Sequence, residues 1–298
     1  NRHSIILCSS MNPSTLNELL EGISSRLANV SETPLLDAQV MIAHILDKPR
    51  TWVLAHTESH LTPQETERLE FSLSQIENGI PLPYVLGSWE FFGRQFLVTP
   101  DVLIPRPETE LLVEKALSWL FLRTKNHPAI NILIADVGCG SGCIGITLAA
   151  NFGPIRVLAS DISFSALRVA SQNAFIHSVH SRLDFVRCHL LPSISQKFDL
   201  ICANLPYIPT HTLHSLEVHK KEPTLALDGG PDGLKFIKPF LSQSSNSIKA
   251  NGLILLEIES SQGSHVLKLA RAFFPKASIE LIQDLAHHDR LISIQQGK

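Results

Sequence analysis

The chain has 298 residues, of which 44% are hydrophobic and 18% charged, with a formal net charge of −3 and a sequence pI near 6.6. These values exclude a disordered chain, because disordered chains are poor in apolar residues and rich in net charge. No long basic run occurs, so the composition does not favour stable binding to a nucleic acid. No apolar run reaches the roughly 20 residues of a membrane-spanning helix, so we expect no membrane insertion.

The cysteines are few and scattered, and most stand within apolar stretches: Cys8, Cys139, Cys143, Cys188 and Cys202. This pattern is typical of reduced thiols in a cytoplasmic protein and predicts no disulfide framework. The apolar patch at residues 5–8 is too short for the core of a signal peptide, and the sequence leaves open whether residues 1–10 precede a start at Met11. We expect a cytoplasmic monomer.

Residues 14–80 have the spacing of amphipathic helices. In the first of them, apolar residues recur three and four positions apart, at Leu16, Leu19, Leu20, Ile23 and Leu27. Thr15 with Glu18, and Thr62 with Glu65, form capping-box patterns that indicate helix starts. We therefore predict a small all-helical amino-terminal domain over residues 11–88.

A linker is expected over residues 89–110. Its first part is rich in aromatic residues and is interrupted by Gly93-Arg94, which predicts a short hairpin. The run Ile104-Pro105-Arg106-Pro107-Glu108-Thr109-Glu110 follows, and its two prolines fix the entry to a helix that extends to about residue 122. Two roles remain open for Arg106 and Glu110, which either order the linker or form a surface pair.

From about residue 130 onward, apolar runs of strand length alternate with segments of helix length, as in βαβ units on a parallel sheet. We predict seven strands, at Ile132–Val137, Arg156–Ser160, Leu183–Cys188, Leu200–Ala203, Leu253–Ile258, Ser278–Ile282 and Leu291–Gln295. Only residues 283–290 separate the last two, too few for a helical crossover, so these strands should pair antiparallel. The carboxyl-terminal domain, residues 111–298, is thus predicted to be an α/β domain with a seven-stranded, doubly wound sheet.

The glycine-rich segment Gly138-Cys139-Gly140-Ser141-Gly142 lies between a predicted strand and a predicted helix. Glycines there let a ligand approach the backbone, and the helix start offers free N–H donors. Asp161 ends the next strand, where an acid can accept hydrogen bonds from ribose hydroxyls. The pair indicates a nucleoside site. The alternatives are a simple tight turn at the glycines and an N-cap role for Asp161 at a helix starting near Ser163.

Asn204-Leu205-Pro206-Tyr207 follows another apolar strand, at the carboxyl edge of the predicted sheet. The Asn204 oxygen and a neighbouring backbone carbonyl can accept the N–H hydrogens of a planar amide, while Tyr207 packs on its plane. The alternative is an ordinary turn punctuated by Asn and Pro.

The chain resembles the amino-methyltransferases of the class I Rossmann-like fold in the order of three motifs: the glycine segment, Asp161 and Asn-x-Pro-Tyr. The linker motifs Phe91-Phe92-Gly93 and Ile104 to Glu110, together with the segments Glu222-Pro223 and Leu227 to Leu234, are similar to the HemK/PrmC family of release factor glutamine N5-methyltransferases. The resemblance covers roughly residues 14–295. It implies methyl transfer from S-adenosyl-L-methionine to the glutamine of the Gly-Gly-Gln loop of class 1 release factors, with the protein substrate between the two domains.

The resemblance also implies roles for individual residues. The cofactor would be held by Gly138, Cys139, Gly140, Ser141, Gly142, Asp161, Leu190 and Asn204. The substrate glutamine would be held by Asn204, Leu205, Pro206 and Tyr207, of which Asn204, Pro206 and Tyr207 are the expected catalytic group. The sequence departs from the family at Leu205, where proline is usual, at Cys188-His189-Leu190, where an acid and an aromatic residue are common, and at Glu259 and His287, where glycine is common.

Three other functions remain as alternatives. A DNA adenine-N6 methyltransferase would present the same planar nitrogen to the same tetrapeptide, but it also needs a basic track and a base-flipping surface. A ribosomal-protein glutamine methyltransferase would share the motifs, and a nucleoside-binding regulator without catalysis is favoured only by Leu205. No metal is expected: His211, His214 and His219 lack ligand spacing, and Cys139 and Cys143 read better as packing residues than as redox groups.

Overall fold

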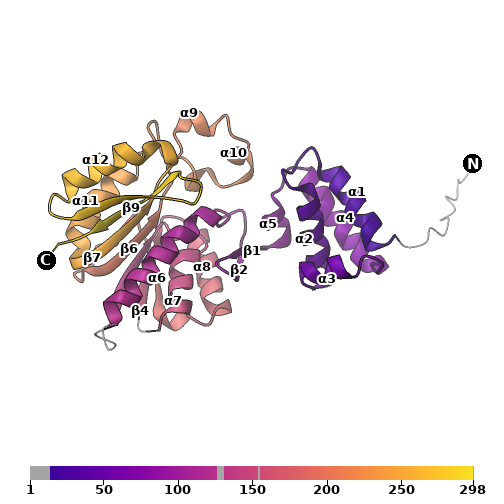
Figure 1. The fold of residues 1–298 in the computed structure, drawn as a ribbon, viewed down its shortest axis with the longest axis horizontal. Coiled ribbons are helices and arrows are strands. Elements are labelled where there is room, and N and C mark those ends of the chain that lie inside the picture. The colour runs from indigo at the N-terminus through magenta and orange to yellow at the C-terminus, as the bar shows by residue number, and fades with distance from the viewer. Residues whose placement is uncertain (1–13, 126–130, 154, 298) are drawn as a thin grey trace, which may run out of the picture. The chain divides into compact units, whose positions relative to one another are not determined.

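The computed structural model describes residues 14–125, 131–153 and 155–297, so Met11 and the residues before it lie outside the described part. The chain divides into two compact units, Asn1–Leu86 and Gly87–Lys298 (Figure 1). The predicted hairpin and linker, residues 89–110, therefore group with the larger unit.

The smaller unit is helical. Its helices are α1 (Leu16–Leu27), α2 (Pro34–Leu46), α3 (Arg50–Ala55), α4 (Pro63–Glu77) and α5 (Leu82–Leu86). Both expected capping boxes form: Thr15 Oγ1 accepts from the N–H of Glu18, while the Glu18 carboxylate accepts from the N–H of Thr15, and Thr62 and Glu65 repeat the arrangement. These reciprocal bonds satisfy N–H groups that a helix start leaves free. The all-helical prediction is confirmed.

The larger unit begins with an antiparallel hairpin of β1 (Ser88–Phe91) and β2 (Arg94–Leu97). Phe91 and Phe96 are buried in the main hydrophobic core, so the hairpin is part of the folded unit. The side chain of Asn173, in α8 (Phe164–Ile176), accepts from the N–H of Leu97 at 2.7 Å and donates to the Leu97 carbonyl at 3.0 Å.

A seven-stranded sheet forms the centre of this unit, in the order β5-β4-β3-β6-β7-β9-β8. The strands are β3 (Ile132–Val137), β4 (Ile155–Asp161), β5 (Leu183–Arg187), β6 (Phe198–Asn204), β7 (Ile248–Glu257), β8 (Ser278–Gln283) and β9 (Asp289–Gln295). Strands β3 to β7 pair in parallel, whereas β9 pairs antiparallel with both β7 and β8. The predicted sheet and its antiparallel final pair are confirmed.

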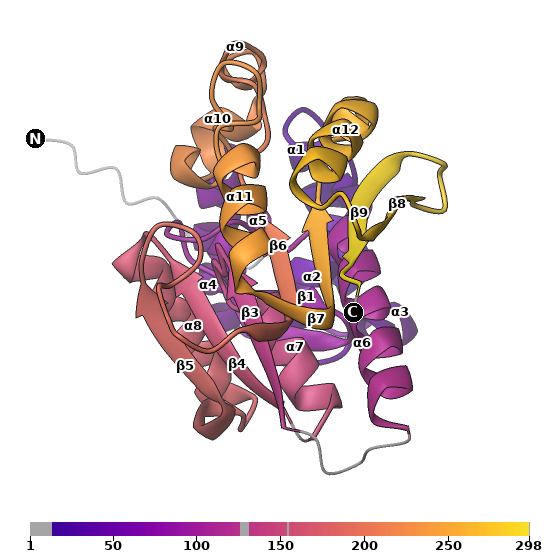
Figure 2. The same ribbon diagram turned by 90° about the vertical axis from the view of Figure 1, so that its left-hand side faces the viewer.

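Helices cover both faces of the sheet (Figure 2). One face packs against α6 (Glu110–Thr124), α7 (Cys143–Asn151) and α8, and the other against α11 (Ile237–Ser247) and α12 (Gly263–Phe273). Short helices α9 (Thr210–Leu213) and α10 (Val218–Lys221) lie in the long connection after β6. Within the described residues, no helix combines the length and apolar character needed to cross a membrane.

Candidate active site

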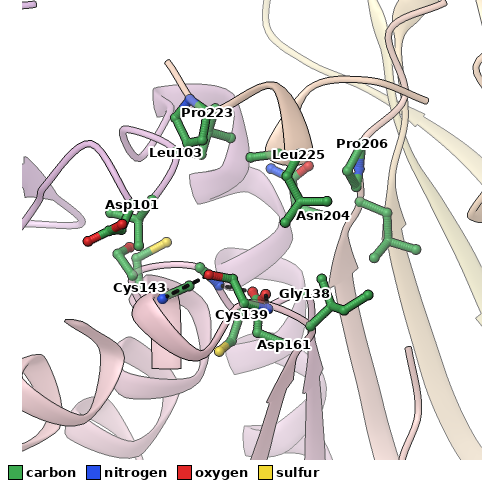
Figure 3. Close-up of a pocket in the computed structure, with 18 of the residues that line it drawn as sticks. Asp101, Leu103, Gly138, Cys139, Cys143, Asp161, Asn204, Pro206, Pro223 and Leu225 are labelled. Carbon is green, nitrogen blue, oxygen red and sulfur yellow. Dashed lines mark hydrogen bonds between the residues drawn. The ribbon is translucent and has the colours of Figure 1, made fainter. Parts of the chain in front are cut away.

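A cavity of about 510 Å³ opens at the carboxyl edge of the sheet, within the larger unit. This is the volume of a typical small-molecule site. In Figure 3, Asp161 and Cys139 lie at one end of it and Leu103 and Pro223 at the other, with Asn204 between them. Its wall is formed by five groups of residues: part of 100–109, part of 138–144, 161–166 with 188–190, 204–206, and 223–226 with 235–236.

The glycine loop forms one wall of the cavity. The N–H groups of Gly138 and Cys139 both donate to the Ser160 carbonyl, at 2.8 and 2.9 Å, which ties the loop to the end of β4. Gly138 has φ +70°, and a Cβ there would lie 3.0 Å from Leu205 Cδ2. The position therefore requires glycine for its backbone conformation and for its close approach to the Asn204 to Tyr207 segment.

Gly142 differs from the other glycines of the motif, because it is absent from the cavity wall. A Cβ at Gly142 would come within 2.8 Å of Ile146 Cδ1 and 3.1 Å of Ala170 Cβ. Its role in this structure is the close packing of α7 on α8. The other residues expected to hold the cofactor all line the cavity: Gly138, Cys139, Gly140, Ser141, Asp161, Leu190 and Asn204.

Asp161 uses both carboxylate oxygens locally. Oδ1 accepts from the N–H of Ser163 at 2.8 Å, and Oδ2 accepts from the N–H of Gly140 at 2.9 Å. Ser163 is the N-cap of α8, since its own side chain accepts from the N–H of Ala166. Asp161 therefore braces the turn before the helix and the glycine loop together. Burial raises the pKa of its carboxyl group, and hydrogen bonds from the backbone oppose that rise.

Asp136, at the end of β3, is a residue of the site region that the sequence interpretation missed. Its Oδ2 accepts from the N–H of Gly145 at 2.9 Å, while Oδ1 is buried without a partner. Burial raises the pKa of this carboxyl group to about 7. The signal was an acid inside an apolar strand directly before the glycine motif.

The cavity wall also contains two aromatic rings to which the sequence prediction gave no role. His189 and Phe236 line the cavity with their ring centroids 5.9 Å apart, and Lys235 Nζ lies 5.1 Å from the centroid of the Phe236 ring. Beside them, Leu190 has φ +62°, and its carbonyl accepts from the Ser160 hydroxyl at 2.8 Å. An isolated Lys-Phe pair gives no sequence signal for such a wall.

The Asn204 to Tyr207 segment splits between two places. Asn204, Leu205 and Pro206 line the large cavity, and Asn204 Nδ2 donates to Thr109 Oγ1 at 3.1 Å. Tyr207 instead lines a neighbouring cavity of about 90 Å³, which shares five residues with the large one: Leu103, Arg106, Asn204, Leu205 and Ala226. The tyrosine hydroxyl donates to Glu257 Oε1 at 3.4 Å, and burial raises its pKa.

Thr109 and Glu257 are further residues that the sequence interpretation missed. Both are almost completely buried, with 2% and 3% of their surfaces exposed. Glu257 ends β7, directly beside Asn204 in the parallel pairing of β6 and β7. Burial raises the pKa of its carboxyl group to about 7, although hydrogen bonding to Thr109 and Tyr207 lowers it in part.

Arg106 and Glu110 both order the linker, each with a partner of its own. Arg106 forms an ion pair with Glu222, whose side chain is only 5% exposed, and the second Glu222 oxygen accepts from the N–H of Ile104 at 3.0 Å. Glu110 accepts from the N–H of Phe92 at 2.8 Å. The segment before α6 is therefore fastened to Glu222, which directly precedes the 223–226 part of the cavity wall, and the first residue of α6 is fastened to the hairpin.

Two histidines lie close together in the connection after β6. His214 Nδ1 and His219 Nε2 lie 3.3 Å apart, but across the described ranges no three His, Cys, Asp or Glu side chains are grouped as metal ligands. Cys139 and Cys143 are buried free thiols, and burial raises the pKa of Cys143 to about 12. Because the thiolate is the reactive form, the raised pKa values argue against redox chemistry at these two thiols.

One protein-family model matches each of the two units. The PrmC N-terminal domain matches residues 18–87, and the methyltransferase small domain matches residues 116–220. Among solved structures, the hMettl16 catalytic domain in complex with a 3′UTR hairpin has a TM-score of 0.53 and 14% identity, covering 80% of this chain and 83% of that one. A methyltransferase from Pyrococcus furiosus has a TM-score of 0.50 and 13% identity, covering 80% and 100%. These likenesses establish the methyltransferase fold of the larger unit.

Similarity to curated relatives extends over nearly the whole chain. A release factor glutamine methyltransferase of Moorella thermoacetica is 38% identical over 279 residues, covering 93% of this chain and 96% of the relative. One from Nitratidesulfovibrio vulgaris is 37% identical over 302 residues, covering 95% and 97%. With the glycine loop, Asp161 and Asn204 assembled around one cavity, the chain is a methyltransferase that belongs to the family of release factor glutamine methyltransferases.

Proposed function

We propose that this protein transfers the methyl group of S-adenosyl-L-methionine to the side-chain amide nitrogen of a glutamine in a class 1 peptide chain release factor. The observation that carries the proposal is the position of Asn204 on the wall of the same cavity as the glycine loop and Asp161. A nucleoside cofactor and a planar amide would thus meet in one enclosed space. The names of the similar proteins support the choice of substrate.

The residues present fit this cofactor. A Cβ at Gly140 would meet nothing within 4 Å, so the loop backbone is open there at the cavity wall, and Asp161 brings a carboxylate to the same wall. Gly138, Cys139, Gly140 and Ser141 would bind the cofactor through the loop, Asp161 would accept hydrogen bonds from its ribose, and Leu190 would pack on its adenine. When bound, the cofactor supplies an electrophilic methyl group on its sulfonium.

The chain's own contribution to the reaction is orientation. An amide nitrogen is a weak nucleophile because its lone pair is delocalised, so the site must hold it close to the methyl group and in line with it. The Asn204 side-chain oxygen and the Leu205 carbonyl would accept its two N–H hydrogens. Apolar residues at the other end of the cavity, including Leu103, Pro223 and Leu225, would exclude water.

The methylated residue would be the glutamine of the Gly-Gly-Gln loop. The reaction would take place in the cytoplasm, where release factors meet ribosomes. Neither DNA nor a ribosomal protein is favoured by a particular feature of the site. Both are included as competing substrates in the test.

The test is one incubation of the purified chain with methyl-labelled S-adenosylmethionine, a class 1 release factor, a ribosomal protein fraction and duplex DNA. We expect label on the release factor, located by peptide mass spectrometry at the loop glutamine. A release factor with that glutamine replaced by alanine is the control and should remain unlabelled. Label on DNA or on a ribosomal protein, with the release factor unmodified, would overturn the substrate assignment.

A further inference from the structure

The glycine-rich segment 227–234 has no part in the reaction scheme above, although it packs directly on Tyr207 and Ile208. The N–H of Ile208 donates to the Leu227 carbonyl at 3.1 Å, and the Ile208 carbonyl accepts from the N–H of Gly229 at 2.8 Å. A Cβ at Gly229 would lie 2.7 Å from the carbonyl carbon of Tyr207. Glycine therefore lets the backbone of this segment contact the backbone of Tyr207.

The buried side chain of Gln262 reaches the same place from the turn after β7. Its Nε2 donates to the Tyr207 carbonyl at 3.0 Å. Because a carbonyl oxygen can only accept, the NH₂ group of the Gln262 amide must be the end that faces it. Gly233 has φ +73°, and a Cβ there would overlap both Gln262 Nε2 and the Tyr207 oxygen. Gly233 thus leaves free the space in which this hydrogen bond forms.

The Tyr207 carbonyl lies two residues after the Leu205 carbonyl, which is proposed above to accept from the substrate amide. Strand β6 ends at Asn204, and the chain continues along the cavity wall through Pro206, which is labelled beside Asn204 in Figure 3. The ring of Pro206 fixes its φ, so few dihedral angles remain free between the two carbonyls. Holding the Tyr207 carbonyl therefore restricts the direction of the Leu205 carbonyl.

We propose that Gln262, with Gly233 beside it, is a positioning residue that holds the Tyr207 carbonyl and thereby aims the Leu205 carbonyl at the substrate amide. The inference rests on the proposed role of the Leu205 carbonyl in binding that amide. Gln262 and Gly233 both stand outside the wall of the large cavity. A change at either residue should therefore affect turnover and leave the affinity for the cofactor unaltered.

The test uses two variants and a matched control. Gln262→Met keeps the length of the side chain and removes the donor, whereas Gly233→Ala places a methyl group in the space of the hydrogen bond. Gly93→Ala is the control, because Gly93 has nearly the same φ, +69°, and a Cβ there would meet nothing within 4 Å. Backbone strain is thus similar in the two alanine variants, and only Gly233→Ala disturbs the Tyr207 carbonyl.

At saturating cofactor and release factor, kcat should fall about tenfold or more in Gln262→Met and in Gly233→Ala, because a small misplacement of a binding group is costly. Gly93→Ala should stay within about twofold of the wild type, since strain alone leaves the site in place. By calorimetry, all three variants should bind S-adenosylmethionine within about threefold of the wild type, because the glycine loop is distant from each change.

The double variant Gln262→Met/Gly233→Ala shows whether the two residues act together. Its loss in kcat should be much smaller than the product of the two single losses, because both residues act on one carbonyl. Losses that multiply in full would overturn the proposal. So would a kcat in Gln262→Met equal to that of Gly93→Ala, or a cofactor affinity that falls in parallel with kcat.

A last measurement does not depend on the substrate. The backbone amide signals of Leu205 and Tyr207 in the NMR spectrum should shift in Gln262→Met and keep their positions in Gly93→Ala. Unchanged signals in Gln262→Met would overturn the positioning role even if release factor is methylated. If wild-type enzyme leaves release factor unmethylated while both signals shift in Gln262→Met, the proposed function fails and Gln262 remains the group that positions this segment.

Discussion

The Asp161 carboxylate accepts a hydrogen bond from the backbone N–H of Gly140, with 2.9 Å between Oδ2 and the nitrogen. One acid thereby holds the glycine loop in place and still lines the cavity that the loop encloses. Any substitution of Asp161 removes a support of the loop together with an acceptor for a ligand.

Asp161→Ala should therefore weaken the binding of S-adenosylmethionine by roughly 1–3 kcal/mol, the scale for a buried group that loses its partner. Isothermal calorimetry measures the change directly. Asp184→Ala makes the same change of charge at an exposed ion pair on β5 and should leave affinity unaltered. Equal affinity in Asp161→Ala, with an unchanged melting curve, would remove Asp161 from the cofactor site.

Asn204→Ala should reduce kcat by about 10²–10³, the usual cost of losing one preorganised group aimed at the reacting centre. Cofactor affinity should change only a few-fold, because the glycine loop and Asp161 are untouched. Single-turnover rates at saturating cofactor measure the effect. Wild-type speed in this variant would contradict the role given to its side-chain oxygen.

Leu205→Pro is the companion substitution, because it restores the residue that is usual in the family. The Leu205 carbonyl is retained, and the buried side chain that contacts Gly138 is replaced by a smaller ring. Activity should be kept or raised if the Leu205 carbonyl is the group that binds the substrate amide. A loss as large as that of Asn204→Ala would instead assign the function to the leucine side chain.

The stability of the fold should depend on pH through Asp136, whose pKa is raised from 3.8 to about 7 by burial. Between these two values the unfolded chain binds fewer protons than the folded one. The Asp136 contribution to the free energy of unfolding therefore falls as the pH rises through this window. Asp136→Asn cannot ionise and keeps an oxygen for the N–H of Gly145, so its stability relative to wild type should increase from about pH 4 to about pH 8. Urea unfolding at several pH values measures this difference, and a constant difference would contradict it.

The bonds that Glu222 makes to Arg106 and Ile104 should stabilise the linker before α6. Glu222→Ala leaves the N–H of Ile104 and the Arg106 guanidinium without their partner, at a cost of about 1–3 kcal/mol in unfolding free energy. The amide of Ile104 should also exchange faster with deuterium. The exposed pair of Arg156 and Asp184 offers a control, since Arg156→Ala should cost at most about 1 kcal/mol. An equal loss of unfolding free energy in the two variants would argue against a stabilising role for the Glu222 bonds.

Most strands of the sheet were predictable because they are runs of apolar residues bounded by polar ones, whereas β8 and β9 alternate apolar and polar residues. Six of the seven predicted strands begin within two residues of their position in the structure. The exception, β7, begins at Ile248 and not at Leu253. Its first part contains Asn251 with φ +56° and polar Lys249, which interrupt the apolar pattern that the prediction depends on.

Much of the candidate site could also be predicted, since Gly138 directly follows β3 and Asp161 and Asn204 are the last residues of β4 and β6, at the edge where parallel strands end. The missed residues are defined by contacts between distant parts of the chain. Thr109 and Asn204 are 95 positions apart, and Arg106 and Glu222 are 116 positions apart. No local pattern in the sequence encodes such pairs. For Gly142, the ligand contact suggested by its place in the motif stays a prediction, and the structure adds its close packing against Ile146 and Ala170.

The Asn173 side chain makes hydrogen bonds to both the N–H and the carbonyl of Leu97 in the hairpin, as the backbone of a neighbouring strand would. It also donates to the Ser141 carbonyl in the glycine loop at 2.9 Å. Protein engineers who exchange amino-terminal domains between relatives have to respect this connection. A graft joined after residue 100 would replace β2, so the buried Asn173 amide in α8 would depend on the incoming strand for these two backbone hydrogen bonds. A graft joined between Leu86 and Gly87 carries the hairpin along with the enzyme it supports.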